Sequence, residues 1–269
     1  MALTQLIVLA VLQAMTEIFP VGAAGPSALF SLALHWPEPA EGFFLAQRVG
    51  LLLAVMAYFW RDVGEMATGV MRAAKGKRDP GARLTLQILA AAIPTLGLGF
   101  VIETYGTDSW KTPGVTAWAI IGFGLLLLLF DRMTMTVKRI EHATYIDAIA
   151  IGLCQLLALV PGAGAAAVTM TMARVLGYER AHAVRFALLL AIPVAGVVTA
   201  RDAFVYFSGD NAGISNVDIL CGVIGFFAGL AALAFMMAWL KRGTFTPFVI
   251  VRLLLGAAVM ALTYGGFTL

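Results

Sequence analysis

The sequence predicts an all-α polytopic membrane protein, and three observations carry this prediction. Of the 269 residues, 61% are hydrophobic and 12% are charged, whereas about a quarter of the residues in a soluble domain are charged. The mean hydropathy is +0.92. Several apolar segments are long enough to cross about 30 Å of hydrocarbon as helices. Because no polar stretch is long enough to fold separately, we expect a single integral membrane domain over residues 1–269.

Two interrupted segments stand out within this apolar chain. The first, residues 13–26, reads QAMTEIFPVGAAGP, and the second, residues 155–167, reads QLLALVPGAGAAA. Each begins as an apolar helix, meets a proline and passes into glycines and alanines. Helix breaks at membrane depth are tolerated only where the freed backbone groups face protein or an enclosed cavity. The two runs therefore predict a shared binding site.

Six uninterrupted segments are predicted to span the membrane. They cover residues 43–60, 84–102, 114–130, 182–200, 219–240 and 248–269. The loop 61–83 is rich in lysine and arginine, so the excess of basic residues in cytoplasmic loops predicts that it faces the cytoplasm. The N-terminal segment lacks the basic region of a cleavable signal and is expected to be retained. The two interrupted segments, with second arms at 27–34 and 163–176, are predicted to form re-entrant hairpins.

An internal repeat is predicted from the order of these segments. IVLAVLQ at residues 7–13 resembles IAIGLCQ at 149–155, and each is followed by a proline, a Gly/Ala tract and three spans. The predicted repeats cover about 1–131 and 146–269. Since the first begins outside and the second inside, they have inverted topology, in which interrupted helices meet at the midplane. We therefore expect Glu17 to be buried close to the second break, at Pro161–Ala165.

The cysteines and histidines do not predict a metal site. Cys154 and Cys221 lie in apolar runs and are interpreted as small buried hydrophobic side chains. His35, His142 and His182 are far apart and lack the spacing of metal ligands. No cofactor is required by this pattern. The net charge of +3 does not indicate binding of nucleic acid, because in a membrane protein the positions of the basic residues report the orientation of the chain.

Three polar residues of the two runs are candidates for ligand binding. Glu17 is an ionisable residue in an apolar run and is therefore a functional hypothesis, the alternative being a protonated or paired structural carboxylate. Gln13 and Gln155 occupy corresponding places in the two repeats. They either contact the ligand or form hydrogen bonds between helices.

The glycines and the basic residues give further candidates. Gly25, Gly162 and Gly164 allow backbone N–H groups to approach an anion, or simply allow tight packing. Arg48 at the outer end of a span and Arg201 in an outer loop are candidate partners for a phosphate on that side. The arginines between residues 174 and 185 are interpreted first as markers of the cytoplasmic side and second as contacts for a lipid phosphate.

The two runs resemble the signatures of the undecaprenyl-diphosphatase family, also known for its link to bacitracin resistance. These signatures read approximately EGxTEFxPVSSSGH and PGxSRSG. The resemblance extends over nearly the whole chain, through Gln47, AAIPTLGLGF (91–100), TYIDAIAIGLCQLLALVPG (144–162), LLLAIPVAG (188–196) and FTPFVIVR (245–252). It implies an interdigitated inverted repeat, a polyprenyl phosphate or pyrophosphate partner, and a multi-pass protein of the bacterial inner membrane. The implied role is recycling of the lipid carrier for peptidoglycan of the cell wall.

This chain departs from the family signatures at most of their chemically active positions. The positions kept from the first signature are Thr16, Glu17, Pro20, Val21 and Gly25. Gln13 stands in place of the first glutamate and Pro26 in place of the histidine. The small hydroxyl run of the family is replaced by Gly22, Ala23 and Ala24. The Ser-Arg-Ser of the second signature is replaced by Gly164, Ala165 and Ala166.

These replacements bear directly on the predicted activity. Cleavage of a pyrophosphate needs cationic or dipolar clamps and a positioned nucleophile, and Glu17 is the one signature carboxylate that remains. We therefore predict a family member that binds an undecaprenyl (pyro)phosphate-type lipid, with phosphatase activity lost or weak; translocation of the lipid is a further hypothesis. The predicted lipid- or phosphate-binding residues are Gln13, Thr16, Gly25, Gln47, Arg48, Gln155, Gly162, Gly164 and Arg201.

Two other interpretations stay open. One is an active undecaprenyl-diphosphate phosphatase with Glu17 as catalytic residue, in which Mg²⁺ or Ca²⁺ substitutes for the missing arginine. The other is a structural partner of another envelope protein. Membrane lipids are expected neighbours in every case, and homo-oligomerisation is left open by the sequence.

Overall fold

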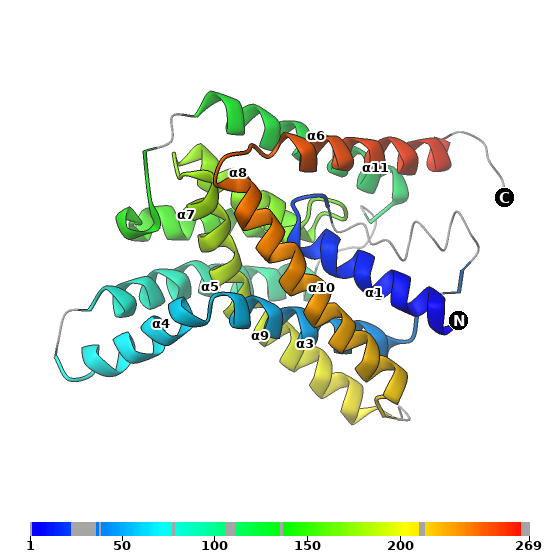
Figure 1. The fold of residues 1–269 in the computed structure, drawn as a ribbon, viewed down its shortest axis with the longest axis horizontal. Coiled ribbons are helices and arrows are strands. Elements are labelled where there is room, and N and C mark those ends of the chain that lie inside the picture. The colour runs from blue at the N-terminus through cyan, green and yellow to red at the C-terminus, as the bar shows by residue number, and fades with distance from the viewer. Residues whose placement is uncertain are drawn as a thin grey trace.

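The fold is known from a computed structural model that describes residues 2–22, 36–37, 39–76, 79–105, 111–134, 137–209 and 213–264. These residues form a helical bundle (Figure 1). In chain order the helices are α1 (Leu3–Ile18), α3 (Glu41–Tyr58), α4 (Trp60–Ala73), α5 (Pro80–Tyr105), α6 (Pro113–Met133), η2 (Ile140–His142), α7 (Tyr145–Gln155), η3 (Leu156–Leu159), α8 (Ala165–Val175), α9 (Arg180–Ser208), α10 (Asn216–Leu240) and α11 (Thr246–Tyr264). The predicted all-α class is confirmed.

Six of these helices are long and apolar enough to cross a membrane: α3, α5, α6, α9, α10 and α11. They coincide with the six predicted spans, so the chain is a polytopic membrane protein. The largest difference is α9, which continues to Ser208 instead of ending near residue 200. The loop predicted over 61–83 also contains a helix, α4, and its buried carboxylate Asp62 pairs with Arg185 of α9, which ties the start of this helix to the bundle.

Small residues let the helices pack with their backbones in contact. A Cβ atom on Gly50 of α3 would lie 2.2 Å from the carbonyl oxygen of Gly222 in α10, and one on Gly152 of α7 would lie 2.1 Å from that of Ala91 in α5. Thr95 of α5 donates its hydroxyl to the carbonyl oxygen of Gly152 at 2.7 Å. Because lipid provides no hydrophobic drive between helices, such close approach and interhelical hydrogen bonding hold membrane bundles together.

The helix pairing has the pattern that an inverted repeat would produce. Helix α1 packs on α10 and α7 packs on α5, while α6 pairs with α11 and α3 with α9. In the two predicted halves α1 corresponds to α7, α3 to α9, α5 to α10 and α6 to α11. Exchanging the halves therefore converts the α1–α10 pair into the α7–α5 pair and maps the α6–α11 and α3–α9 pairs onto themselves. Figure 1 shows α6 and α11 running side by side along one edge of the bundle. The repeat boundaries themselves stay a prediction.

The interrupted segments are made of shorter helices. Helix α1 has 16 residues, and α7 and α8 have 11 each. A helix of this last length reaches about 16 Å, roughly half of the hydrocarbon thickness. The second arm predicted at 27–34 lies outside the described residues, and re-entry of either segment on its own side of the membrane stays a prediction.

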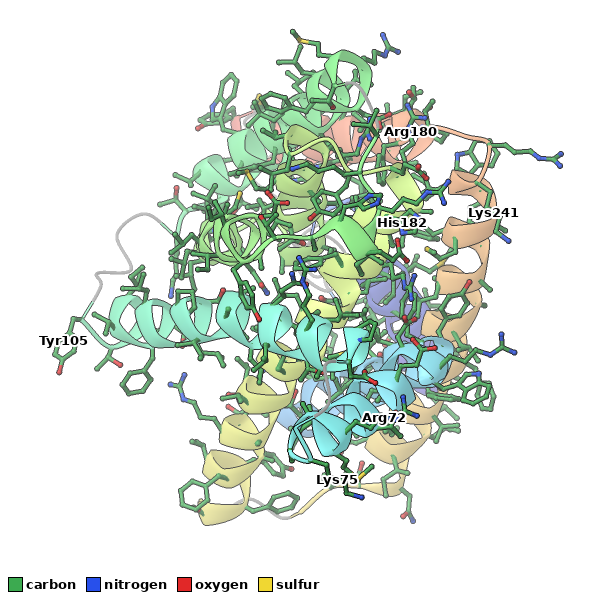
Figure 2. The ribbon with its side chains drawn as sticks, turned by 90° about the vertical axis from the view of Figure 1, so that its left-hand side faces the viewer. Arg72, Lys75, Tyr105, Arg180, His182 and Lys241 are labelled. Atoms are coloured by element: carbon green, nitrogen blue, oxygen red, sulfur yellow. The ribbon has the colours of Figure 1, made fainter. Side chains whose placement is uncertain are left out.

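A buried carboxylate ties several helix ends together on one side of the bundle. Asp131, at the end of α6, accepts hydrogen bonds from Nε of Arg174 at 3.0 Å and Nε of Arg180 at 2.8 Å. Its second oxygen accepts from the backbone N–H of Phe245, just before α11, at 3.3 Å. Figure 2 shows Arg180, His182 and Lys241 on the side of the molecule opposite to Tyr105. This separation agrees with the predicted alternation of basic and acidic loops.

Candidate functional site

The first break follows the end of α1. Helix α1 stops at Ile18 because Phe19 is extended, with φ −76° and ψ 145°, as the residue before a proline prefers. Gly22 then takes φ +105°, a conformation that glycine adopts without strain. The last turns of α1 carry two of the predicted residues: Nε2 of Gln13 donates to Oε1 of Glu17 at 3.1 Å.

Thr16 lies between these two residues but turns its hydroxyl to its own helix. Its Oγ1 donates to the carbonyl oxygens of Leu12 and Gln13, at 3.0 and 3.2 Å. The Glu17 side chain is exposed, so the expectation that it is buried is wrong. An exposed carboxylate, held by a neighbouring amide, is available to a ligand.

The second break lies between α7 and α8. After Gln155 the chain tightens into the 3₁₀ turn η3, Val160 becomes extended before Pro161, and Gly162 and Gly164 take φ of +89° and +74°. Gly164 is the N-cap of α8 and offers no side-chain cap. The first N–H groups of α8, which have no acceptor within the helix, therefore begin at Ala165 beside the break.

The two breaks meet, as predicted. A Cβ atom on Gly22 would lie 3.1 Å from the carbonyl oxygen of Gly162 and 3.5 Å from Cζ of Arg252. Arg252 of α11 is fully buried, and its Nη1 donates to the carbonyl oxygen of Pro20 at 3.2 Å. Its Nη2 donates to the carbonyl oxygens of Gly162 at 2.8 Å and Ala163 at 2.7 Å. We call this meeting point of residues 20–22, 162–164 and Arg252 the junction.

The remaining predicted residues lie in three different settings. Gln155 is buried, and its Oε1 has no hydrogen-bond partner among the described residues. Gln47 is buried between α3 and α10, where its Nε2 donates to the carbonyl oxygen of Cys221 at 2.6 Å. This places Gln47 in helix packing. Gly25, like Ala23, Ala24 and Pro26, lies outside the described residues.

The two predicted outer arginines are both paired with carboxylates. Arg48 pairs with Asp202 of α9, and Arg201 pairs with Glu103 of α5 at 2.8 Å. Arg48 also interacts electrostatically with Glu17, which ties it to the first run. Both pairs are solvent-exposed in part, so they are worth little to stability, and each arginine can turn to another anion at small cost.

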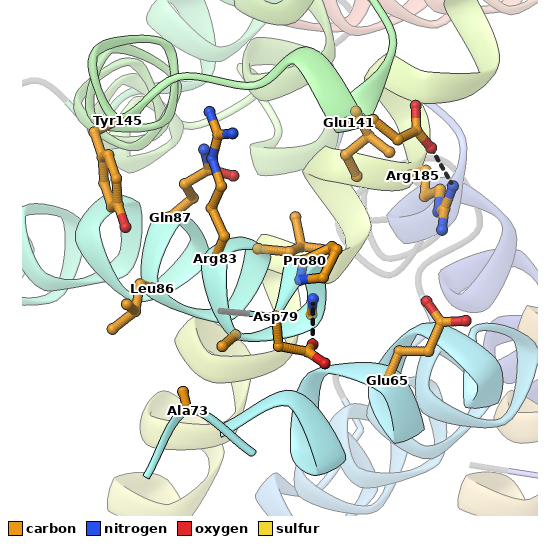
Figure 3. A pocket seen from close by; sticks show the side chains of 14 residues that line it. Glu65, Ala73, Asp79, Pro80, Arg83, Leu86, Gln87, Glu141, Tyr145 and Arg185 are labelled. Carbon is orange, nitrogen blue, oxygen red and sulfur yellow. Dashed lines mark hydrogen bonds and ion pairs between the residues drawn. The ribbon is translucent and has the colours of Figure 1, made fainter. Parts of the chain in front are cut away.

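A pocket of about 810 Å³ lies away from the junction, among α4, α5, η2 and α9 (Figure 3). Its charged walls carry Glu65, Asp79, Arg83, Glu141 and Arg185. The Arg72 guanidinium beside Asp79 holds the pKa of that carboxyl below its usual range. Arg185 faces Glu141 at 3.7 Å. Because acidic and basic groups neutralise one another here, this pocket has no clear preference for an anion.

The residues described by the structure include no group of three or more His, Cys, Asp or Glu side chains placed to hold a metal ion. Sequence reasoning missed Arg252, the residue that joins both runs. The signal was present, because an arginine inside the apolar run of FTPFVIVR is costly in a membrane and marks a buried partner.

The fold and the junction define a class: polytopic helical membrane proteins with two helix breaks that meet inside the bundle. The family described as "Bacitracin resistance protein BacA" matches residues 6–258. The chain belongs to this family. Its relatives include "Undecaprenyl-diphosphatase 1" of Rhodospirillum rubrum, 43% identical over 99% of this chain and 97% of the relative.

Two further relatives cover the chain as completely. "Undecaprenyl-diphosphatase 1" of Paramagnetospirillum magneticum is 39% identical over 99% of both chains. "Undecaprenyl-diphosphatase" of Roseobacter denitrificans is 37% identical over 98% of this chain and 100% of the relative. The similarity therefore extends over both interrupted segments and all six spans, which confirms the resemblance seen in the sequence.

Proposed function

We propose that this protein binds an undecaprenyl diphosphate-type lipid at the junction, and that its phosphatase activity is lost or weak. The names of the relatives supply the class of lipid. The observation that carries the proposal is the first turn of α8: it begins beside the junction with Ala165, Ala166 and Ala167. An alanine methyl group neither donates a hydrogen bond nor carries charge.

Binding is supported by the backbone. The uncapped N–H groups at the start of α8 form an anion-binding terminus, and the three junction glycines of positive φ let a headgroup approach the main chain. Two accessible groups, Glu17 and Arg48, lie on the adjoining helices α1 and α3. These features suffice to hold a phosphate without any catalytic side chain from the second run.

Hydrolysis has weaker support. Breaking the bond between two phosphoryl groups requires donors aimed at the charge that develops on the leaving phosphate. Removing a single such donor typically lowers kcat by about a hundredfold or more, and here Gly164, Ala165 and Ala166 replace three at once. The accessible carboxylate of Glu17 remains as the acceptor for a water proton, but it lacks a cationic partner from the second run.

The second candidate function is an active undecaprenyl-diphosphate phosphatase, and the names of the relatives favour it over loss of activity. In this alternative Glu17 activates the attacking water and Gln13 orients the carboxylate through their 3.1 Å hydrogen bond. A divalent ion, held by Glu17 and the diphosphate oxygens, would supply the missing positive charge. Either activity belongs in the bacterial inner membrane, in the recycling of the lipid carrier for the cell wall.

Phosphate release decides between the two. The unmodified protein is purified, given a polyprenyl diphosphate with and without Mg²⁺, and compared with one of the undecaprenyl-diphosphatase relatives. We expect binding of the lipid with negligible release. Release near the level of the relative, abolished by Glu17→Ala, would establish the enzyme instead. Failure to bind either the diphosphate or the monophosphate lipid would overturn both functions, and flip of labelled lipid in vesicles tests the translocation hypothesis separately.

A further inference from the structure

Arg252 is a buried cation with an unusual set of partners. Its side chain is 0% exposed, and its Nε donates to the carbonyl oxygen of Ile120 at 2.7 Å. With Pro20, Gly162 and Ala163, four of the five N–H donors that a guanidinium offers are used. All four acceptors are neutral backbone carbonyls, and two of the three segments that supply them are the breaks.

Arg174 provides the internal comparison. It is also 0% exposed, but its Nε lies 3.0 Å from Oδ1 of Asp131. Among the described residues, Arg252 forms no such ion pair. Taking a charge out of water is costly, and a buried arginine usually has a carboxylate partner that neutralises it. At Arg252 the carbonyl dipoles stabilise the positive charge but do not neutralise it.

The hydrogen bonds of Arg252 have a structural explanation of their own. Carbonyl groups at the ends of α1 and η3 have no N–H partner within a helix, so the Arg252 guanidinium donates hydrogen bonds to them and acts as a C-terminal cap. This explains the geometry. The net positive charge of Arg252 remains. It lies at the junction, where the uncapped N-terminus of α8 adds the positive end of its helix dipole.

We propose that Arg252 is a positioning and specificity-determining residue of the junction. It fixes the two breaks against each other, and its uncancelled charge makes the site prefer the more highly charged headgroup: a diphosphate over a monophosphate, and either over an uncharged polyprenol. The inference rests on the proposed function and adds the source of its selectivity. It holds whether or not the bound diphosphate is hydrolysed.

Binding of three probes to the full chain in nanodiscs tests this inference. The probes share one short polyprenyl chain and end in a diphosphate, a monophosphate or a hydroxyl. For Arg252→Gln we expect the affinity for the diphosphate to fall about tenfold or more, the affinity for the monophosphate to fall less, and the affinity for the alcohol to stay unchanged. A purely structural role would lower all three affinities by the same factor.

Two further variants separate charge from geometry. Arg252→Lys keeps the charge but cannot reach four carbonyls from one ammonium group, so the ranking of the probes should remain while the thermal midpoint falls. Arg174→Gln is the matched control, since it removes an equally buried arginine that has a carboxylate partner, Asp131. It should lower the thermal midpoint and leave the ranking of the probes unchanged.

The outcomes are distinct. An unmodified protein that binds the three probes equally overturns the inference without any variant, and so does an Arg252→Gln protein that keeps the original ranking. An unmodified protein that binds no probe overturns the proposed function. If Arg252→Gln does not fold, Arg252→Lys carries the test: equal binding of the three probes by a variant that keeps the positive charge overturns the inference.

Discussion

Gly152 of α7 and Ala91 of α5 are in backbone contact: a Cβ atom on Gly152 would lie 2.1 Å from the carbonyl oxygen of Ala91. Replacing Gly152 by alanine must push α7 away from α5 and weaken the hydrogen bond from Thr95 to the carbonyl oxygen of Gly152. Overpacking of this kind costs roughly 1–3 kcal/mol.

We therefore expect Gly152→Ala to lower the thermal midpoint of the purified protein. Gly97→Ala is the control, because Gly97 also lies in a membrane helix but a Cβ atom added to it would meet nothing within 4 Å. There the better helix propensity of alanine should leave stability equal or raise it by up to about 1 kcal/mol. Equal midpoints for the two variants would show that α5 and α7 are not in contact.

Restoring the family signature should recover hydrolysis only as a group. Ala165→Arg alone adds a charge without its hydroxyl neighbours, and groups that act as a unit are strongly non-additive. We expect little phosphate release from this single variant. Release should rise when Gln13→Glu, Ala23→Ser, Pro26→His, Gly164→Ser and Ala166→Ser accompany it. A large gain from Ala165→Arg alone would mean that the rest of the site is already competent.

Tyr178 should make the protein sensitive to alkaline pH. Burial, and the hydrogen bond that its hydroxyl donates to Asp147 at 3.0 Å, raise the pKa of Tyr178 well above its usual value. Above about pH 10, where tyrosine in the unfolded chain loses its proton, the folded chain still holds that proton. The unfolded state then binds fewer protons, so the free energy of unfolding falls as pH rises.

Tyr178→Phe isolates this effect. At about pH 8 the variant should be less stable by about 1 kcal/mol, because one buried hydrogen bond is lost. Between about pH 8 and about pH 11 its thermal midpoint should fall less steeply than that of the unmodified protein, since its unfolded state has one fewer group to titrate. Parallel curves would show that Tyr178 is not the residue responsible.

The orientation in the membrane is tested by cysteine labelling. In a background without Cys154 and Cys221, we expect Lys75→Cys to react with an impermeant reagent from the cytoplasmic side and Tyr105→Cys from the opposite side. The basic loop that carries Lys75 predicts this, and α5 separates the two positions. Labelling of both from one side would contradict the six-span topology.

Hydropathy and charge alternation predicted the six spans closely, because length and polarity alone decide whether a helix crosses lipid. They did not predict α4, because they count only segments apolar enough to cross lipid; the pairing of its Asp62 with Arg185, 123 residues later, is likewise not visible in the sequence. The two proline-glycine breaks were also found from sequence, since a proline inside a helix removes a backbone hydrogen bond and kinks or ends the helix.

The surroundings of each side chain were less predictable. Gln47 was expected to contact a lipid phosphate and instead donates to the backbone of α10. An amide in an apolar run signals a buried hydrogen bond, but the sequence does not say whether its partner is a ligand or another helix. For Arg252 the sequence signals a buried arginine in an apolar run, but not its partners, because backbone carbonyls leave no trace in side-chain patterns.

The bonds of Arg252 also set an order of events during synthesis. Its partners Pro20, Ile120 and Gly162 precede it by 232, 132 and 90 residues, so each of these carbonyls leaves the ribosome long before its donor. Until α11 enters the bilayer, the carbonyl oxygens at the ends of α1 and η3 must accept hydrogen bonds from other donors or from water. A nascent chain stalled before residue 252 would hold five of its six spans but no finished junction. The last helix to be inserted therefore completes the site that the first helix begins.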